Sequence, residues 1–159
     1  MTFDSYHLLE RAFCSIKLPD MTIETVKTLI FLCGIGHIVL CFVSAIIPKV
    51  LNWKEHLKDV QPLIRQMFWT YAAYILVINF CFGVVSVLGT EELVNGSFLA
   101  KCINLFIAVY WFARVLIQFF YFDKSEAPEG LMFTLGEIAL VGLFIGFTLV
   151  YSCAFYYNF

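Results

Sequence analysis

Two ionisable side chains lie inside long apolar stretches of the C-terminal half, where a charge is most able to do chemistry. Arg114 precedes the charged turn at residues 123–130, and Glu137 follows it. At a rise of about 1.5 Å per residue, antiparallel helices on the two sides of this turn bring both residues to similar depth. Because a lone charge in hydrocarbon costs about 3 kcal/mol, we expect Arg114 and Glu137 to pair.

Two interpretations of this pair stay open. A desolvated carboxylate whose partner can move could hold a proton or an anion, whereas the simpler interpretation is a structural clamp. The side chains of Tyr110, Gln118 and Asn79 offer more hydrogen bonds than one ion pair needs. Tyr110, Arg114 and Gln118 also share one helix face, since they are spaced by four residues. This pattern favours a polar pocket.

His37 is a third candidate, because Cys33 and Cys41 lie one helical turn to either side of it. The two cysteines are about 12 Å apart along a helix, so one metal ion could bind His37 and only one of them. A packed, hydrogen-bonded histidine is the better interpretation. We therefore predict an internal polar layer without metal or cofactor, formed by His37, Asn79, Tyr110, Arg114, Gln118 and Glu137.

The cysteines and the known enzyme motifs add little. Four cysteines come one from each apolar stretch, which makes a four-thiolate site conceivable; they are Cys33, Cys81, Cys102 and Cys153. However, the chain has no C-x-x-C, and cysteine is an ordinary small residue in buried helices. The sequence also has no glycine-rich phosphate loop, G-x-S-x-G or H-E-x-x-H.

Composition identifies the elements that must position these residues. The 159 residues are 62% hydrophobic and only 14% charged, which is far from a soluble domain. Four stretches are long enough to cross the bilayer, at residues 28–47, 67–88, 98–121 and 131–151. The sequence predicts an all-α fold, a bundle of four transmembrane helices over residues 21–159. Gly142 and Gly146 form a G-x-x-x-G spacing for helix contact.

Two further segments are amphipathic. Apolar residues recur at helical spacing within residues 1–20, and again between Pro48 and Gln66 around Trp53. Both segments are expected to form helices in the membrane interface. Five Lys and Arg residues flank the first and third connections and four flank the opposite side. By this count both termini lie outside the cell.

The segments RQMFWTYAAYIL (65–76) and YWFARVLIQFFYFD (110–123), together with the plan of four spans, resemble small DoxX-like and uncharacterised bacterial membrane proteins. The resemblance covers the four spans and rests on architecture. It implies a location in the bacterial inner membrane and assigns no catalytic residue.

The function that follows is non-enzymatic. We predict either an accessory or structural subunit of a larger membrane assembly or homo-oligomer, or a protein that binds a lipid, quinone or isoprenoid. A groove for such a ligand competes with the simpler view that the aromatic residues, 18% of the chain, form interfacial belts. The alternative is a membrane redox or lipid-modifying enzyme that uses the polar layer around Arg114 and Glu137. Membrane lipids are expected partners, and the absence of a basic block excludes nucleic acid.

Overall fold

The structure is a computed structural model that describes residues 22–121 and 131–159. The described part is all α, which confirms the predicted fold class. Its four long helices are α2 (Ile23–Val50), α4 (Pro62–Leu88), α5 (Phe98–Phe120) and α6 (Leu131–Tyr157). All four are long and apolar enough to cross a membrane, so the chain is an integral membrane protein. The predicted interfacial segment at residues 1–20 lies outside the described residues.

Local sequence signals set the helix ends. The hydroxyl of Thr22 accepts a hydrogen bond from the backbone N–H of Thr25 at the start of α2, and Ser97 does the same for Ala100 at the start of α5. Pro62 opens α4, where its missing N–H would be unpaired in any case. Gly89 ends that helix. These caps satisfy backbone donors that a helix end would otherwise leave open.

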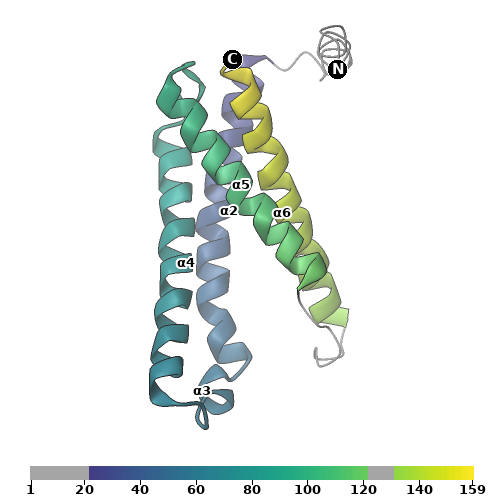
Figure 1. The fold of residues 1–159 in the computed structure, drawn as a ribbon. Coiled ribbons are helices and arrows are strands. Elements are labelled where there is room, and N and C mark those ends of the chain that lie inside the picture. Colours follow the sequence, from purple (N-terminus) through teal and green to yellow (C-terminus); the bar gives the residue numbers. More distant parts are fainter. Residues whose placement is uncertain (1–21, 122–130) are drawn as a thin grey trace, which may run out of the picture.

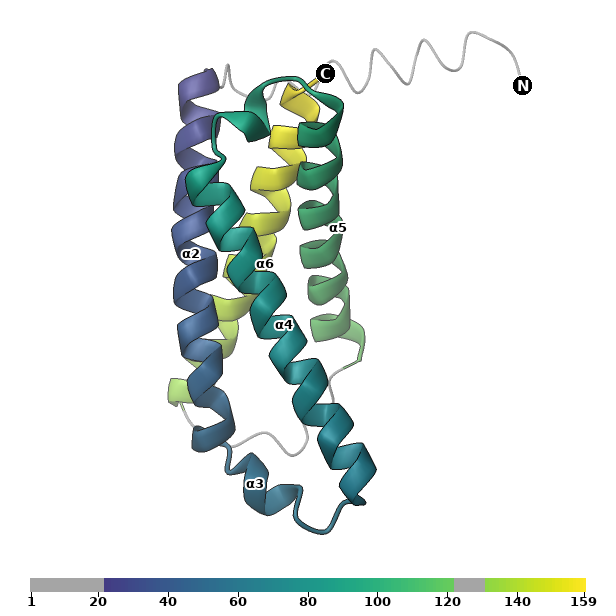
Figure 2. The same cartoon turned by 90° about the vertical axis from the view of Figure 1, so that its left-hand side faces the viewer.

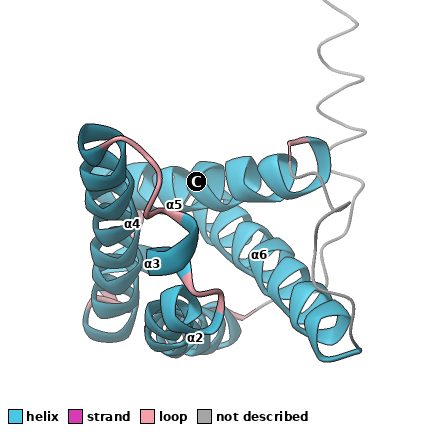
Figure 3. Cartoon of the chain, turned by 90° about the horizontal axis from the view of Figure 1, so that it is seen from below, coloured by secondary structure: helices cyan, strands magenta, loops and turns pink. Residues whose placement is uncertain are grey.

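The helices form two hairpins, α2 with α4 and α5 with α6 (Figure 1). They run alternately down and up, so the start of α2 and the end of α6 lie at the same end of the bundle. The hairpins meet at that end, where a short 3-10 helix, η1 (Glu92–Val94), joins α4 to α5. Figures 1 and 3 show that they diverge toward the opposite end. The divergence separates the two hairpins at that end.

Two glycines set the contact between α2 and α4. A Cβ atom added to Gly83 would lie 3.1 Å from the carbonyl oxygen of Gly34, and one added to Gly34 would lie 3.0 Å from the backbone nitrogen of Val87. The two backbones therefore approach as only glycine allows. From this contact α4 leans away from α2 (Figure 2). Gly142 and Gly146 differ, because a Cβ on either would meet nothing within 4 Å among the described residues.

The connection between α2 and α4 contains less helix than the sequence predicts. The interfacial helix expected between Pro48 and Gln66 is present only as α3 (Trp53–His56). Pro48 does not end α2, which continues to Val50, and α4 already begins at Pro62. The two ends of the predicted segment therefore belong to α2 and α4. Trp53 packs on Phe68 with ring centroids 5.0 Å apart and holds α3 against α4.

Candidate functional site

His37 is completely buried near the middle of α2, and both ring nitrogens have partners. Nδ1 lies 2.6 Å from the carbonyl oxygen of Cys33, and Nε2 lies 2.8 Å from Nε1 of Trp111 on α5. A carbonyl only accepts and an indole N–H only donates. Nδ1 therefore carries the proton, Nε2 accepts, and the imidazole is neutral.

Aromatic rings enclose this histidine from three helices. Phe147 of α6 stacks on the imidazole with centroids 3.9 Å apart, and Phe82, Trp111 and Tyr151 contact it edge-on. We call these five residues the histidine cluster. The hydroxyl of Tyr151 also bonds to that of Ser86 on α4, at 2.5 Å. The cluster thus joins all four long helices.

The histidine cluster is arranged for packing rather than for chemistry. A metal ligand or proton carrier needs a ring nitrogen that is free to exchange partners. In His37 both are committed to groups of the chain, and Cys33 offers its carbonyl and not its thiol. This is the packed, hydrogen-bonded histidine that the sequence favours. Its position joins the hairpins and limits how far they can separate.

A cavity of about 170 Å³ lies between the hairpins, below the histidine cluster. All four long helices line it. Its walls include Leu40, Ser44, Asn79, Trp111, Arg114 and Phe144. We call this cavity the hairpin cleft. It brings together two residues of the predicted polar layer, Asn79 and Arg114, whereas His37 does not line it.

Asn79 is the unusual residue of the cleft. Its side chain is 4% exposed, and its Oδ1 atom has no hydrogen-bond partner within the described chain. Leaving a buried amide oxygen unpaired costs about 1–3 kcal/mol, and most native buried polar groups do have partners. A ligand in the cavity that carries a hydrogen-bond donor would provide the missing partner for this oxygen.

Arg114 supplies the charge. Its guanidinium lies over the ring of Phe144, 5.8 Å from the centroid. Among the described residues the ion pairs link Lys27 to Glu24 and Glu91, and Lys58 to Glu55; none involves Arg114. An arginine in a membrane span usually faces a partner or a cavity. Here the cavity is the hairpin cleft.

The predicted pairing of Arg114 with Glu137 is not found among the ion pairs of the described residues. The Glu137 carboxylate instead accepts a hydrogen bond from Gln118 Nε2 at 3.3 Å. The reason is the direction of helical side chains, which tilt toward the N-terminus of their own helix. In α5 this direction leads away from the turn, and in α6 it leads toward the turn. By this tilt Arg114 is expected to point away from Glu137. Gln118 lies one helical turn closer to the C-terminal end of α5 than Arg114, and it reaches the carboxylate.

Five of the six residues of the predicted polar layer thus separate into three groups. His37 belongs to the histidine cluster, Asn79 and Arg114 line the cleft, and Gln118 bonds to Glu137. Within the described chain, Tyr110 has no hydrogen bond to any of these residues; its ring packs against Phe82 and Trp111, with centroids 5.2 and 5.3 Å away. The shared helix face of Tyr110, Arg114 and Gln118 does not make one pocket.

Sequence reasoning missed Trp111, Phe147, Tyr151 and Ser86. The interpretation of the aromatic residues as interfacial belts does not single out rings in the middle of the spans. For Trp111 a signal was available, because an indole N–H in the middle of a span must find an acceptor. His37 is a polar residue at similar depth in the first span. That argument would have predicted the contact.

Two buried asparagines, Asn104 and Asn158, form hydrogen bonds at the end where the hairpins meet. The Nδ2 atoms of Asn104 and Asn158 both donate to the carbonyl oxygen of Leu93, and the Oδ1 atom of Asn158 accepts from the N–H of Gly96. Oδ1 of Asn104 has no partner within the described chain. Its amide is nevertheless fixed by two hydrogen bonds, and it does not line the hairpin cleft. These hydrogen bonds tie η1 to α5 and α6.

The cysteines lie apart. Cys81 and Cys102 are exposed on the surfaces of α4 and α5, and Cys33 and Cys153 are half-buried. In the described part of the chain no three side chains of His, Cys, Asp or Glu gather as a metal site would require. Cys14 lies outside the described residues.

Comparison of the chain with known protein families, with curated proteins and with solved structures finds no match.

Proposed function

We propose that this integral membrane protein binds an apolar ligand of the bilayer with a hydroxyl on its head group, a quinol or an isoprenoid alcohol, in the hairpin cleft. The observation that carries the proposal is the unpaired Oδ1 atom of Asn79 in the cleft wall. Arg114 can donate to an oxygen of the ligand, and Asn79 can accept from a ligand hydroxyl. A head group that both accepts and donates satisfies the two residues together.

The size of the cleft limits the ligand. Sites that enclose a whole small molecule have volumes of roughly 300–1,000 Å³. At about 170 Å³, the hairpin cleft has room for a head group of one ring or similar size. Because the hairpins diverge on this side, an isoprenoid or acyl tail can leave between them toward the bilayer (Figure 1). Apolar walls such as Leu40 and Phe144 suit the part of the ligand next to the head group.

The test is copurification of the ligand with the full chain in a mild detergent, followed by mass spectrometry of the organic extract. Wild type should retain a stoichiometric quinol or isoprenoid alcohol, and Asn79→Leu and Arg114→Leu should each reduce it at least tenfold. Arg114→Lys, which keeps the charge, should retain part of it. Thr148→Val is the matched control, since this hydroxyl bonds to the carbonyl of Phe144 in its own helix and does not line the cleft.

Three outcomes would overturn this proposal. Ligand retained equally by wild type and Asn79→Leu would place it elsewhere on the protein. A stable larger complex without ligand would instead support the accessory-subunit function. A chromophore in the visible spectrum that depends on Arg114 would favour the redox enzyme.

A further inference from the structure

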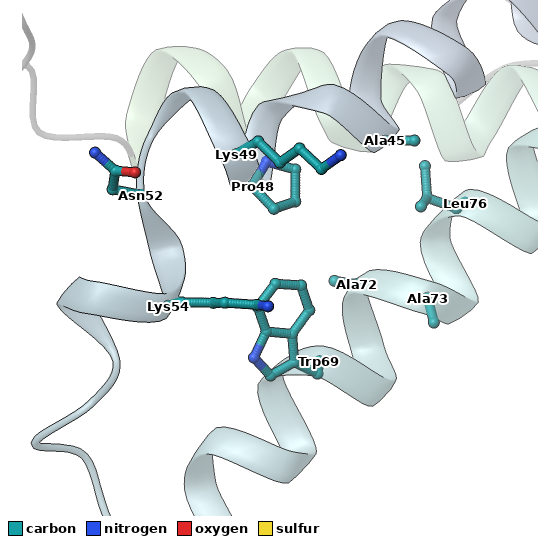
Figure 4. Close-up of a pocket in the computed structure, with 9 residues that line it drawn as sticks. All are labelled: Ala45, Pro48, Lys49, Asn52, Lys54, Trp69, Ala72, Ala73 and Leu76. Carbon is teal, nitrogen blue, oxygen red and sulfur yellow. The ribbon is translucent and has the colours of Figure 1, made fainter.

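A second cavity lies outside the hairpin cleft, where α4 leans away from α2 and α3 bridges the gap (Figures 2 and 4). Its volume is about 490 Å³. The wall contributed by α4 consists of Trp69, Ala72, Ala73 and Leu76. The alanines leave space that larger side chains would fill, and the wall is apolar. Lys49 and Lys54 also line this cavity, and we call it the lysine groove.

Two lysines reach into the groove from different elements. Lys49 comes from the last turn of α2 and Lys54 from α3, and Figure 4 shows both ammonium groups directed into the cavity. The residues that line the groove include no Asp or Glu. In the described chain neither lysine has an ion-pair partner, whereas Lys58 on the same connection pairs with Glu55. Two positive charges thus face one apolar wall without a protein anion.

The groove lies at one membrane boundary. It is formed where α2 ends and α4 begins, and two tryptophans mark the level. The ring centroids of Trp53 and Trp69 are 6.0 Å apart. Tryptophan is enriched at the height of the lipid head groups. The ammonium groups are therefore close to the depth of lipid phosphates, and the wall of α4 continues from there into the hydrocarbon.

We propose that the lysine groove binds an anionic phospholipid of the surrounding bilayer. Its phosphate lies between Lys49 and Lys54, and one acyl chain runs along Ala72, Ala73 and Leu76. Charge complementarity selects this occupant, because a zwitterionic lipid carries a cation that the two lysines repel. Pro48, Ala72 and Leu76 line both cavities, but the polar groups differ, since the lysine groove uses neither Asn79 nor Arg114. The substitutions that test the two proposals are therefore different.

The test is native mass spectrometry of the full chain in detergent, titrated with dioleoyl phosphatidylglycerol and separately with dioleoyl phosphatidylcholine. Each lysine near an anionic lipid contributes a factor of about five in affinity. Lys49→Gln or Lys54→Gln should therefore weaken phosphatidylglycerol binding about fivefold, and the double variant about 25-fold, to the level of phosphatidylcholine. Lys58→Gln is the matched control. It removes the same charge outside the groove and should leave the affinity unchanged.

Further variants and a competition experiment distinguish the possible causes of a loss of lipid binding. The double variant Lys49→Arg and Lys54→Arg should keep most of the affinity, which separates loss of charge from loss of fold. Inorganic phosphate should not displace the lipid; displacement at millimolar concentration would make free phosphate the ligand and overturn the proposal. Equal binding of both lipids by wild type, or an effect of Lys58→Gln as large as that of the double variant, would also overturn it.

Discussion

The histidine cluster and the hairpin cleft are neighbours in one bundle, yet they treat polar groups in opposite ways. In the histidine cluster both nitrogens of His37 and the hydroxyl of Tyr151 are bonded to other residues, and aromatic rings fill the space around them. In the cleft the oxygen of Asn79 has no partner in the described chain, and Arg114 has no ion pair there. Both regions contain polar groups at membrane depth, but only the cleft leaves them available.

This difference distinguishes polar groups that stabilise the fold from polar groups that are free to bind a ligand. A fully bonded polar group in hydrocarbon fixes the helices that it connects, and exchanging it for a ligand would break those bonds. An unbonded group is costly unless something outside the chain completes it. The predictions below test whether the two regions differ as the geometry requires.

The largest effect is expected at Trp111. Trp111→Ala removes a buried ring and the donor to His37, and should lower the free energy of unfolding by about 3–5 kcal/mol. Trp111→Phe keeps most of the ring but leaves Nε2 of His37 unpaired, which should cost about 1–3 kcal/mol. Unfolding by dodecyl sulfate in mixed micelles measures both. Phe112→Ala is the control, because Phe112 faces outward and is 52% exposed. Its change should stay within about 0.5 kcal/mol.

A smaller effect is expected where α2 meets α4. A Cβ at Gly83 would lie 2.7 Å from Cγ1 of Ile38 as well as against the backbone of Gly34. Gly83→Ala should therefore destabilise the protein by about 1–3 kcal/mol in the same assay. Gly142→Ala makes the matched change in open space, and the helix propensity of alanine should make it neutral or stabilising. Equal effects of the two variants would contradict the close contact.

The sequence is sufficient to predict the helices, but it does not show which face of each helix packs against the others. Hydropathy and length predict the four spans, and Pro62 and Ser97 are residue types that favour a helix start. Rotation of each helix about its axis is set by packing against the others, which one sequence does not display. The partner of Glu137 is a different case, because the tilt of side chains toward the helix N-terminus favours Gln118 over Arg114 and can be read from the sequence. The width of the hairpin cleft depends on the angle between the two hairpins, and the spacing of residues in the sequence does not predict that angle.

The corrected pairing gives a weaker but discriminating prediction. A double-mutant cycle with Gln118→Leu and Glu137→Gln should give a coupling free energy of about 0.6 kcal/mol, which is typical of hydrogen bonds between membrane helices. The cycle between Arg114→Leu and Glu137→Gln should give a smaller coupling. If the second cycle gives the larger value, Arg114 does pair with Glu137 and the described geometry is wrong at this point.

The smallest change in stability is expected in the hairpin cleft, and it tests the comparison most directly. His37→Leu and Asn79→Leu each replace a buried polar side chain by leucine in the middle of a span. The first leaves the N–H of Trp111 without an acceptor and should cost about 1–3 kcal/mol. The second removes an amide whose oxygen is already unpaired, beside a cavity with room for the larger side chain. Asn79→Leu should therefore leave the free energy of unfolding unchanged or raise it, in ligand-free protein. A loss as large as that of His37→Leu would show that Asn79 is bonded in the folded protein, and the cleft would then be a second structural cluster rather than a binding site.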